Sequence, residues 1–225
     1  MKYILLIVLI CFIVIYINFY YYPYIFKIKN TNLFYCHIPK TGGTSFIEEY
    51  LYNPFKISWH YPVINYPIQI QKKFIAIVRN PYSRLVSCYE FFNKNGLYYE
   101  KYIQICKHLG ILQQSRFIKK EENFELFILN LNNQTKNEWL DKMILKTQTS
   151  YLKNRNNKIY CQIGKYETLT QDLSKLLNQE INLPKLNSTT KEKHWKDYYT
   201  SKTAQIVYNH YKEDFINFNY SAILR

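Results

Sequence analysis

A lysine, three hydroxyl side chains and two adjacent glycines stand together in the segment Lys40–Ser45, directly after an apolar run. The glycine pair lets the backbone adopt positive φ and approach a ligand closely. A helix that starts near Thr44 or Ser45 would add unpaired N–H groups and the positive end of its dipole. We therefore expect a cradle for a phosphate or sulfate group, although an ordinary strand-to-helix turn is the alternative. The candidate ligand-binding residues are Lys40, Thr41, Gly42, Gly43, Thr44 and Ser45.

This segment is not a Walker A loop. That motif, G-x-x-x-x-G-K-[ST], places its lysine after the last glycine, whereas Lys40 precedes Gly42 and Gly43. The order of residues therefore counts against an ordinary P-loop nucleotide kinase.

A second polar group follows another apolar run. Arg79 comes directly after Lys73–Val78, and Arg84 and Ser87 lie three residues apart, on one face of an expected helix. A guanidinium with a nearby hydroxyl suits a phosphate dianion, because it donates two parallel hydrogen bonds. The alternatives are a solvated helix face for Arg84 and a packing role for Ser87. Combined with the upstream cradle, the pattern favours ligand binding.

The segments His37–Ser45 and Ile77–Tyr89 together resemble the paired cofactor signatures of Golgi-type carbohydrate sulfotransferases, which include the heparan sulfate 2-O- and 6-O-sulfotransferases. The resemblance implies that the first segment holds the 5′-phosphosulfate of 3′-phosphoadenosine 5′-phosphosulfate (PAPS). It also implies that Arg79 and Ser87 contact the 3′-phosphate. Weaker similarity continues through Gln148–Leu152, Ile163–Leu169 and the end of the chain, so the resemblance covers roughly residues 33–220.

Sulfuryl transfer is an in-line displacement, so positioning and charge stabilisation should dominate it. Lys40 is the candidate to neutralise charge on the leaving phosphate oxygen. His60 lies between the two motifs. The heparan sulfate enzymes that this chain resembles carry their catalytic histidine there, and the pKa of an imidazole suits a general base. Packing on Trp59 is the alternative for His60. We expect no metal, and the fallback bases are Glu48, Glu49 and Glu90.

Other polar residues carry weaker signals. His37 points from a buried strand and is expected to be structural. Gln148 and Tyr151 match a family segment near the acceptor site. The loop Asn187–Lys191 either closes over the adenosine or is a plain surface loop. The histidines without any partner pattern are His108, His194 and His210.

Alternating apolar runs and helix signals surround these residues. The runs Leu33–Ile38 and Lys73–Val78 predict buried parallel strands, and Asn80 followed by Pro81 predicts a helix start. The further predicted elements are a strand over Lys158–Ile163, and helices over Thr44–Leu51, Pro81–Phe92, Asn123–Leu129, Thr168–Asn178 and Ser201–Tyr211, with 98–146 mainly helical. The alternation indicates an α/β fold, a three-layer P-loop-like domain whose small parallel sheet is flanked by helices. Ligands bind such sheets at the carboxyl ends of the strands.

Residues 1–27 are expected to form a signal-anchor transmembrane segment, and residues 28–225 the sulfotransferase domain. Tyr3–Tyr22 supplies 20 residues interrupted only by Asn18, enough to span a bilayer. A cleaved signal peptide is the alternative, but no small-residue cleavage site follows. Flanking lysines do not decide the orientation. The resemblance favours a single-pass type II protein of the Golgi or another secretory membrane, with a lumenal catalytic domain, and the sequons at Asn133, Asn187 and Asn219 agree with it.

The formal net charge of +14 favours anionic partners. Because the lysines are scattered, we expect no nucleic-acid partner. Cys36, Cys88, Cys106 and Cys161 allow two disulfides, yet Cys36 and Cys88 are expected to be buried free thiols. The oligomeric state is left open.

These observations favour a membrane-anchored, PAPS-dependent sulfotransferase that acts on a carbohydrate hydroxyl, including those of anionic glycans. The alternatives are a P-loop-like kinase and a catalytically dead, membrane-tethered glycan-binding protein.

Overall fold

The computed structural model describes residues 26–51, 60, 62–94, 123–131, 144–183 and 193–224. Within these ranges no helix combines the length and the apolar character needed to cross a membrane. The predicted anchor Tyr3–Tyr22, the loop Asn187–Lys191 and most of the predicted helical region 98–146 lie outside them.

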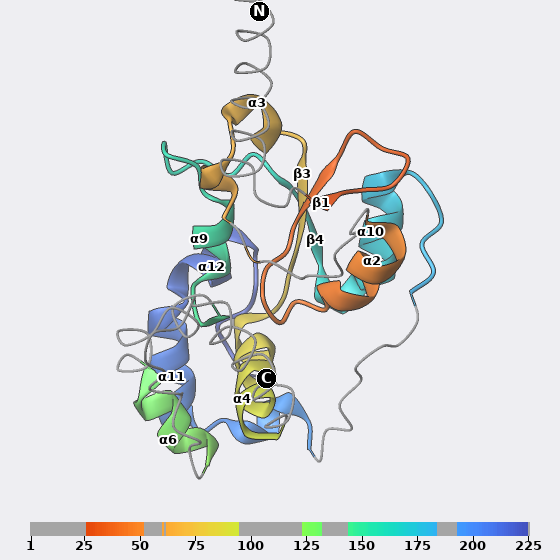
Figure 1. Cartoon of the computed structure of the whole chain (residues 1–225). Coiled ribbons are helices and arrows are strands. Elements are labelled where there is room, and N and C mark those ends of the chain that lie inside the picture. The colour runs from red at the N-terminus through yellow and green to blue at the C-terminus, as the bar shows by residue number, and fades with distance from the viewer. Residues whose placement is uncertain are drawn as a thin grey trace, which may run out of the picture.

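A small, mostly parallel sheet forms the centre of the fold (Figure 1). Its strands, which lie in the order of the chain, are β1 (Phe26–Lys27), β2 (Phe34–Cys36), β3 (Phe74–Val78) and β4 (Gln162–Lys165). β2 and β4 both pair in parallel with β3, and Ala76 is the Cα partner of Cys36 and of Ile163. β1 is antiparallel to β2. The predicted strands at Leu33–Ile38 and Lys73–Val78 therefore contain β2 and β3.

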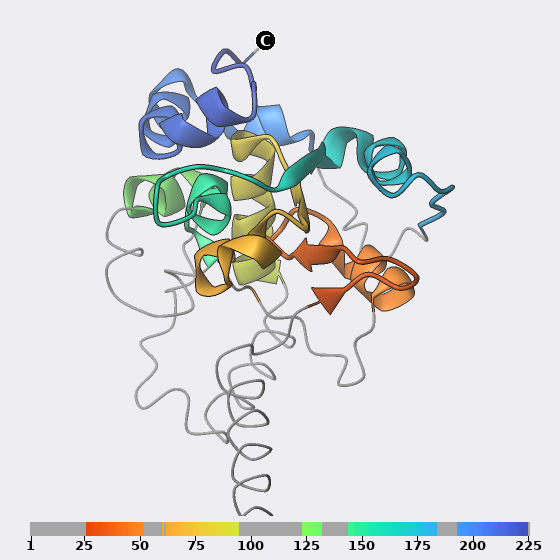
Figure 2. The ribbon, with the colours of Figure 1, turned by 90° about the horizontal axis from the view of Figure 1, so that it is seen from above.

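Helices cover both faces of this sheet, so the fold has three layers (Figures 1 and 2). The helices are α2 (Gly43–Tyr50), α3 (Ile68–Gln71), α4 (Pro81–Lys94), α6 (Phe124–Leu129), α9 (Gln148–Leu152), α10 (Leu169–Leu177), α11 (Ser201–His210) and α12 (Lys212–Asn217). Three short 3-10 turns are η2 (Val63–Asn65), η3 (Tyr166–Thr168) and η4 (Trp195–Tyr198). Because strand side chains alternate in direction, Ile75 and Ile77 pack with α2 and α10, whereas Ala76 and Val78 pack with α9.

The start of α4 follows the sequence pattern closely. The Asn80 side-chain oxygen accepts hydrogen bonds from the backbone N–H groups of Tyr82 (3.0 Å) and Ser83 (3.3 Å), which is the N-cap arrangement predicted for it. Pro81 is the first helical residue, where its missing N–H leaves no bond unmade. Arg79 is thus placed between the end of β3 and the beginning of α4.

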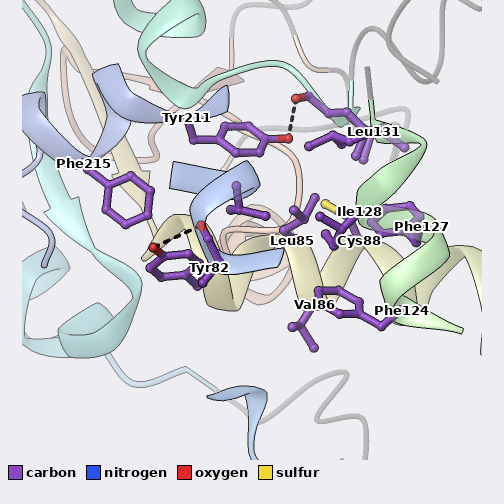
Figure 3. Close-up of a cluster of buried hydrophobic side chains, with 14 residues drawn as sticks. Tyr82, Leu85, Val86, Cys88, Phe124, Phe127, Ile128, Leu131, Tyr211 and Phe215 are labelled. Atoms are coloured by element: carbon purple, nitrogen blue, oxygen red, sulfur yellow. Dashed lines mark hydrogen bonds between the residues drawn. The ribbon is translucent and has the colours of Figure 1, made fainter. Parts of the chain in front are cut away.

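A second hydrophobic core joins α4 to the helices at the end of the chain (Figure 3). Two buried tyrosines link its parts by hydrogen bonds. The Tyr82 hydroxyl lies 2.8 Å from the carbonyl of Ala222 and 3.4 Å from that of Ala204, and the Tyr211 hydroxyl donates to the carbonyl of Leu145 (2.7 Å). Both hydroxyls are satisfied although buried, as such groups require. This core fixes α4, and with it the residues at its N-terminus.

The strand predicted at Lys158–Ile163 is wrong in position, because β4 begins only at Gln162. The preceding residues form a polar turn, in which the side chain of Asn154 accepts from the backbone N–H groups of Asn156 and Lys158, both at 2.9 Å. Asn157 adopts a φ of 57°, a conformation that asparagine tolerates. This turn and the residues that follow it, up to Cys161, therefore lie outside β4.

Three described cysteines, Cys36, Cys88 and Cys161, are buried free thiols. The prediction for Cys36 and Cys88 is confirmed, and no disulfide links these three to one another. Cys106 lies outside the described residues.

Candidate functional site

The loop that links β2 to α2 turns through two left-handed residues. Lys40 has a φ of 65° and Gly42 a φ of 80°, and a left-handed conformation is uncommon for a residue with a side chain. The Thr41 hydroxyl donates to the carbonyl of Ile38 (2.9 Å) and closes the turn from inside. α2 then begins at Gly43, with Gly42 as an N-cap that supplies no side-chain hydrogen bond. The first turn of α2 therefore offers N–H groups to an external acceptor.

Neither glycine of this loop leaves room for a side chain. A Cβ at Gly42 would lie 2.5 Å from Cε2 of Tyr166. A Cβ at Gly43 would lie 2.7 Å from Cδ2 of His37 and 2.8 Å from the hydroxyl of Tyr35. The close approach expected from the glycine pair is thus present, with an aromatic or imidazole ring against each glycine.

Arg79 lies against this loop. Its Nη1 donates to the carbonyl of Lys40 (3.2 Å), its Nε donates to the hydroxyl of Ser83 (2.8 Å), and its guanidinium stands 4.1 Å from the ring centroid of Tyr166. Within the described part of the chain, Nη2 has no hydrogen-bond partner. The guanidinium is thus held on two sides, and its Nη2 edge is available to an anion.

The contact between Arg79 and Lys40 brings the two predicted anion-binding segments together. In a trans peptide the carbonyl and the next N–H point in opposite directions. Since the Lys40 carbonyl faces Arg79, the Thr41 N–H faces away from it. The N–H groups of Lys40 and Thr41 have no hydrogen-bond partner among the described residues. The arginine therefore contacts the loop on the side of the Lys40 carbonyl, and the free backbone donors belong to the same loop.

Arg84 has a different role from the predicted one. It is 2% exposed, and its guanidinium donates to three backbone carbonyls: Nε to Pro39 (2.9 Å), Nη1 to Lys146 (2.9 Å) and Nη2 to Ile144 (2.7 Å). These bonds tie the loop to the segment before α9. Arg84 is therefore a brace beneath the loop, and the ligand-binding interpretation of it is replaced.

Lys40 is partly buried beside α4. Its ammonium stands 4.4 Å from the ring centroid of Phe91, a favourable cation–π distance. Burial lowers the pKa of Lys40, with a further decrease from the positive charge of Arg79 and an opposing contribution from Cys88. A lysine in this setting is less strongly solvated than a surface lysine, which strengthens its interaction with an anion.

His60 approaches the loop from a separate part of the chain. Its Nδ1 lies 3.0 Å from the backbone oxygen of His37, and the two rings stand 4.3 Å apart between centroids. A carbonyl oxygen can only accept, so Nδ1 carries the proton and Nε2 keeps its lone pair. Burial lowers the pKa of His60 to about 4; the His37 hydrogen bond opposes this shift, and the charges of Arg84 and Lys40 add to it. His60 is consequently a neutral imidazole at pH 7 with one basic nitrogen.

The remaining predicted residues are spread over this region. Thr41 is fully buried and Ser45 is buried, Thr44 is exposed, and Ser87 is partly buried on α4. The side chain that contacts Arg79 is Ser83 rather than Ser87. The spacing of four residues between Arg79 and Ser83 was a readable signal for this contact. However, Arg79 precedes the helix, and its rotamer was not predictable from the sequence.

The three fallback bases, Glu48, Glu49 and Glu90, differ in exposure and in their contacts. Glu48 and Glu49 are exposed on α2, as solvated helix residues are. Glu90 is buried and accepts a hydrogen bond from the Tyr198 hydroxyl, so it is committed to packing α4 against η4. Glu48 and Glu49 are exposed to solvent and Glu90 is engaged with Tyr198, which leaves His60 as the better candidate.

Sequence reasoning missed Tyr166 and Glu167 as parts of the site. Tyr166 fills the space between Gly42 and Arg79. The carboxylate of Glu167 accepts from the backbone N–H of Asn80 (2.9 Å) and from the hydroxyl of Tyr220 (2.8 Å). These contacts hold η3 against the start of α4. The weak similarity at Ile163–Leu169 was the available signal.

The described residues contain no group of three or more histidine, cysteine or acidic side chains that could hold a metal ion. The comparison with protein families gives one match: a model described as the sulfotransferase family covers residues 23–221. No curated protein and no solved structure matches the chain.

Proposed function

We propose that this chain, which belongs to the sulfotransferase family, transfers a sulfuryl group from PAPS to a hydroxyl group of a carbohydrate acceptor. The observation that carries the proposal is the 3.2 Å contact from Arg79 Nη1 to the Lys40 carbonyl. It places the segment proposed for the 5′-phosphosulfate beside the arginine proposed for the 3′-phosphate, as one nucleotide with two anionic ends requires.

The donor fits the groups present. The free N–H groups of Lys40 and Thr41, with the first turn of α2, suit the 5′-phosphosulfate. The open Nη2 edge of Arg79 suits the 3′-phosphate. In this proposal Gly42 and Gly43 allow the close approach, and Thr44, Ser45 and Ser87 supply hydroxyls around the two ends.

PAPS supplies an activated sulfuryl group. The acceptor oxygen bonds to sulfur as the bond from sulfur to the phosphate oxygen breaks. His60 takes the hydroxyl proton on Nε2, the nitrogen left basic by the Nδ1 contact with His37. Lys40 balances the charge that the departing phosphate oxygen gains. Adenosine 3′,5′-bisphosphate (PAP) is the product, and no step requires a metal ion.

The carbohydrate acceptor rests on the resemblance of His37–Ser45 and Ile77–Tyr89 to the Golgi-type enzymes. The formal net charge of +14 favours anionic glycans among the acceptors. Screening glycans with radiolabelled PAPS and the full chain tests this part, and transfer to tyrosine peptides alone would contradict it.

We also place the enzyme in a secretory membrane as a type II protein anchored through residues 3–22. Asn219 is an exposed sequon within the described residues, so a lumenal domain would expose it to glycosylation. Loss of mass on glycosidase treatment, smaller in Asn219→Gln than in the wild-type chain, supports this orientation. Accessibility of the domain to cytosolic protease in sealed vesicles contradicts it.

Two substitutions test the mechanism directly. Lys40→Met should lower kcat by roughly 10²–10³-fold and also weaken PAP binding, because Lys40 is proposed to contact the 5′-phosphate. His60→Ala should lower kcat by roughly 10²–10⁴-fold with PAP binding retained. His194→Ala is the control, since His194 is exposed and, within the described residues, the partners of its side chain are its sequence neighbours Trp195 and Lys196. Sulfate transfer that survives both changes overturns the mechanism, and stabilisation by Mg-ATP but not by PAP would favour a kinase instead.

A further inference from the structure

Gln148 takes the place of a missing strand neighbour at the end of β3. Val78 is the last residue of β3 that pairs with β4. At the next residue, the Arg79 N–H donates to the Gln148 side-chain oxygen (2.8 Å), and the Gln148 side-chain nitrogen donates to the Arg79 carbonyl (2.7 Å). A primary amide thus satisfies both backbone groups of one residue, as an adjacent strand would.

Gln148 and the residue after it are held in place by hydrogen bonds to Asp214. The carboxylate of Asp214 on α12 accepts from the backbone N–H groups of Gln148 and Thr149, both at 2.8 Å. All three residues are fully buried at 0% exposure, and the Asn217 side chain adds a hydrogen bond to the Thr149 hydroxyl (3.2 Å). Asp214 therefore anchors the first turn of α9 and holds Gln148 in place.

This arrangement controls the direction of the Arg79 side chain. The guanidinium meets Ser83, the Lys40 carbonyl and the Tyr166 ring, but those contacts act only at the far end of a long side chain. Arg79 follows the last paired residue of β3, so its Cα–Cβ bond is oriented by the two Gln148 hydrogen bonds together with the Glu167 bond to the Asn80 N–H. A displacement of about 1 Å in a binding group can reduce activity about 10²-fold.

We propose that Gln148, held by Asp214, is a positioning residue that aims Arg79 at the 3′-phosphate of the donor and so sets selectivity for 3′-phosphorylated nucleotides. This role differs from the acceptor-site role that sequence similarity gave to Gln148. It rests on the proposed function, because it assumes that Arg79 binds the 3′-phosphate.

The test compares the dissociation constants of PAP and adenosine 5′-phosphate, which lacks the 3′-phosphate. The wild-type chain should prefer PAP by roughly 10–150-fold, the range for charge-assisted hydrogen bonds. Gln148→Met has a similar length without the amide, and should reduce this preference about tenfold or more. Its affinity for adenosine 5′-phosphate should stay within about threefold of the wild-type value.

Gln71→Met is the matched control. Gln71 is also a buried glutamine, but it donates to the carbonyl of Tyr66 (2.6 Å), the residue after η2. This variant should keep the full preference for PAP. Asp214→Asn, which keeps one oxygen acceptor, should shift the preference in the same direction as Gln148→Met but less.

A measurement on the wild-type chain does not depend on any variant folding. Hydrogen exchange at the Arg79 amide reports opening of its bond to Gln148, and PAP should slow this exchange more than adenosine 5′-phosphate does at equal saturation.

The outcomes separate the two claims. A wild-type chain without preference for PAP overturns the proposed 3′-phosphate site itself. If the wild-type chain prefers PAP, two results with Gln148→Met overturn the positioning role while the proposed function stands. In one, the variant keeps the preference for PAP; in the other, it binds both nucleotides more weakly by the same factor. Equal protection of the Arg79 amide by both nucleotides also overturns the positioning role.

Discussion

At the scale of single residues, the environment of His60 decides which of its nitrogens can act. The His37 carbonyl holds the proton on Nδ1, so Nε2 is the basic nitrogen. Three groups that can carry positive charge face the ring: Lys40, Arg84 and His37, the last with its pKa lowered well below its usual value by burial. Burial is the main reason why the pKa of this imidazole is lowered, and the charges of Arg84 and Lys40 add to the effect.

The pH dependence of transfer should reflect that environment. The pKa of about 4 for His60 means that protonation removes the base only in acid. The kcat/KM for the acceptor should be level between about pH 6 and 8 and should fall about tenfold per pH unit once the pH drops below the pKa of His60. The anionic donor opposes the cationic field, so the acid limb measured with bound donor lies above 4. An acid limb that persists unchanged in His60→Gln contradicts the assignment.

Residue types and spacing predicted much of this neighbourhood, but not all of it. Lys40 and the two glycines were readable because backbone requirements at a tight turn favour few residue types. Arg79 was readable because it follows a buried strand. Arg84 was misassigned since its three partners are backbone carbonyls, which leave no trace in a sequence. The functional roles of these residues stay predictions.

At the scale of elements, the entry into α2 depends on the absence of a side chain at Gly43. In Gly43→Ala, the new Cβ would overlap His37 and the Tyr35 hydroxyl at 2.7–2.9 Å, so the loop must shift. We expect kcat/KM to fall about 10²-fold, the size of effect that a misplacement of about 1 Å produces.

Two further variants give this prediction its control. Tyr35→Phe removes one of the overlapping atoms, so the double variant Tyr35→Phe/Gly43→Ala should recover part of the lost activity. Glu49→Ala, on the exposed side of the same helix, should change activity less than threefold. Full activity in Gly43→Ala would show that the loop does not need this close packing.

The brace formed by Arg84 connects elements rather than ligands, so its loss should appear as instability. Arg84→Met removes the donors to three carbonyls, of which those of Pro39 and Ile144 are buried. The loss should lower the free energy of unfolding by about 3 kcal/mol or more. At about 2–4 °C per kcal/mol, Tm should fall by at least about 6 °C.

The exposed Arg155 provides the comparison for this prediction. Arg155→Met should change the free energy of unfolding by less than about 0.5 kcal/mol. Calorimetry on both variants makes the measurement. Equal Tm values for Arg84→Met and the wild-type chain would show that the Arg84 hydrogen bonds do not stabilise the fold.

Element prediction succeeded where one local signal decided the outcome. The Asn80 cap and Pro81 fixed the start of α4, and continuous apolar runs fixed β2 and β3. It failed at β4, where Ile159 belongs to the turn that Asn154 organises and pairs only with Lys153. Sheet register depends on partners distant in sequence, so the apolar run alone could not place the strand.

At the scale of the whole molecule, the donor site depends on segments from the full length of the described chain. β2 and its loop come from the first quarter, α4 from the second, and α9, η3 and α12 from the remainder (Figure 1). The contact of Glu167 with both Asn80 and Tyr220 is one such long-range tie. Binding of a nucleotide to this site should therefore stabilise the whole fold rather than one segment.

This coupling gives the last prediction, which concerns ligand and metal together. At a PAP concentration 100 times its dissociation constant, the free energy of unfolding should rise by about 2.7 kcal/mol, and Tm by about 5–11 °C. Because the proposed binding groups are N–H donors, Lys40 and Arg79, the increase should be the same in EDTA and in added Mg²⁺. Sulfate transfer should likewise survive dialysis against EDTA. A Tm increase that appears only with Mg²⁺, or that is equal for ATP and PAP, would show that these groups recognise a metal-bound triphosphate, and the pairing of the loop with Arg79 around a 3′,5′-bisphosphate would then be wrong.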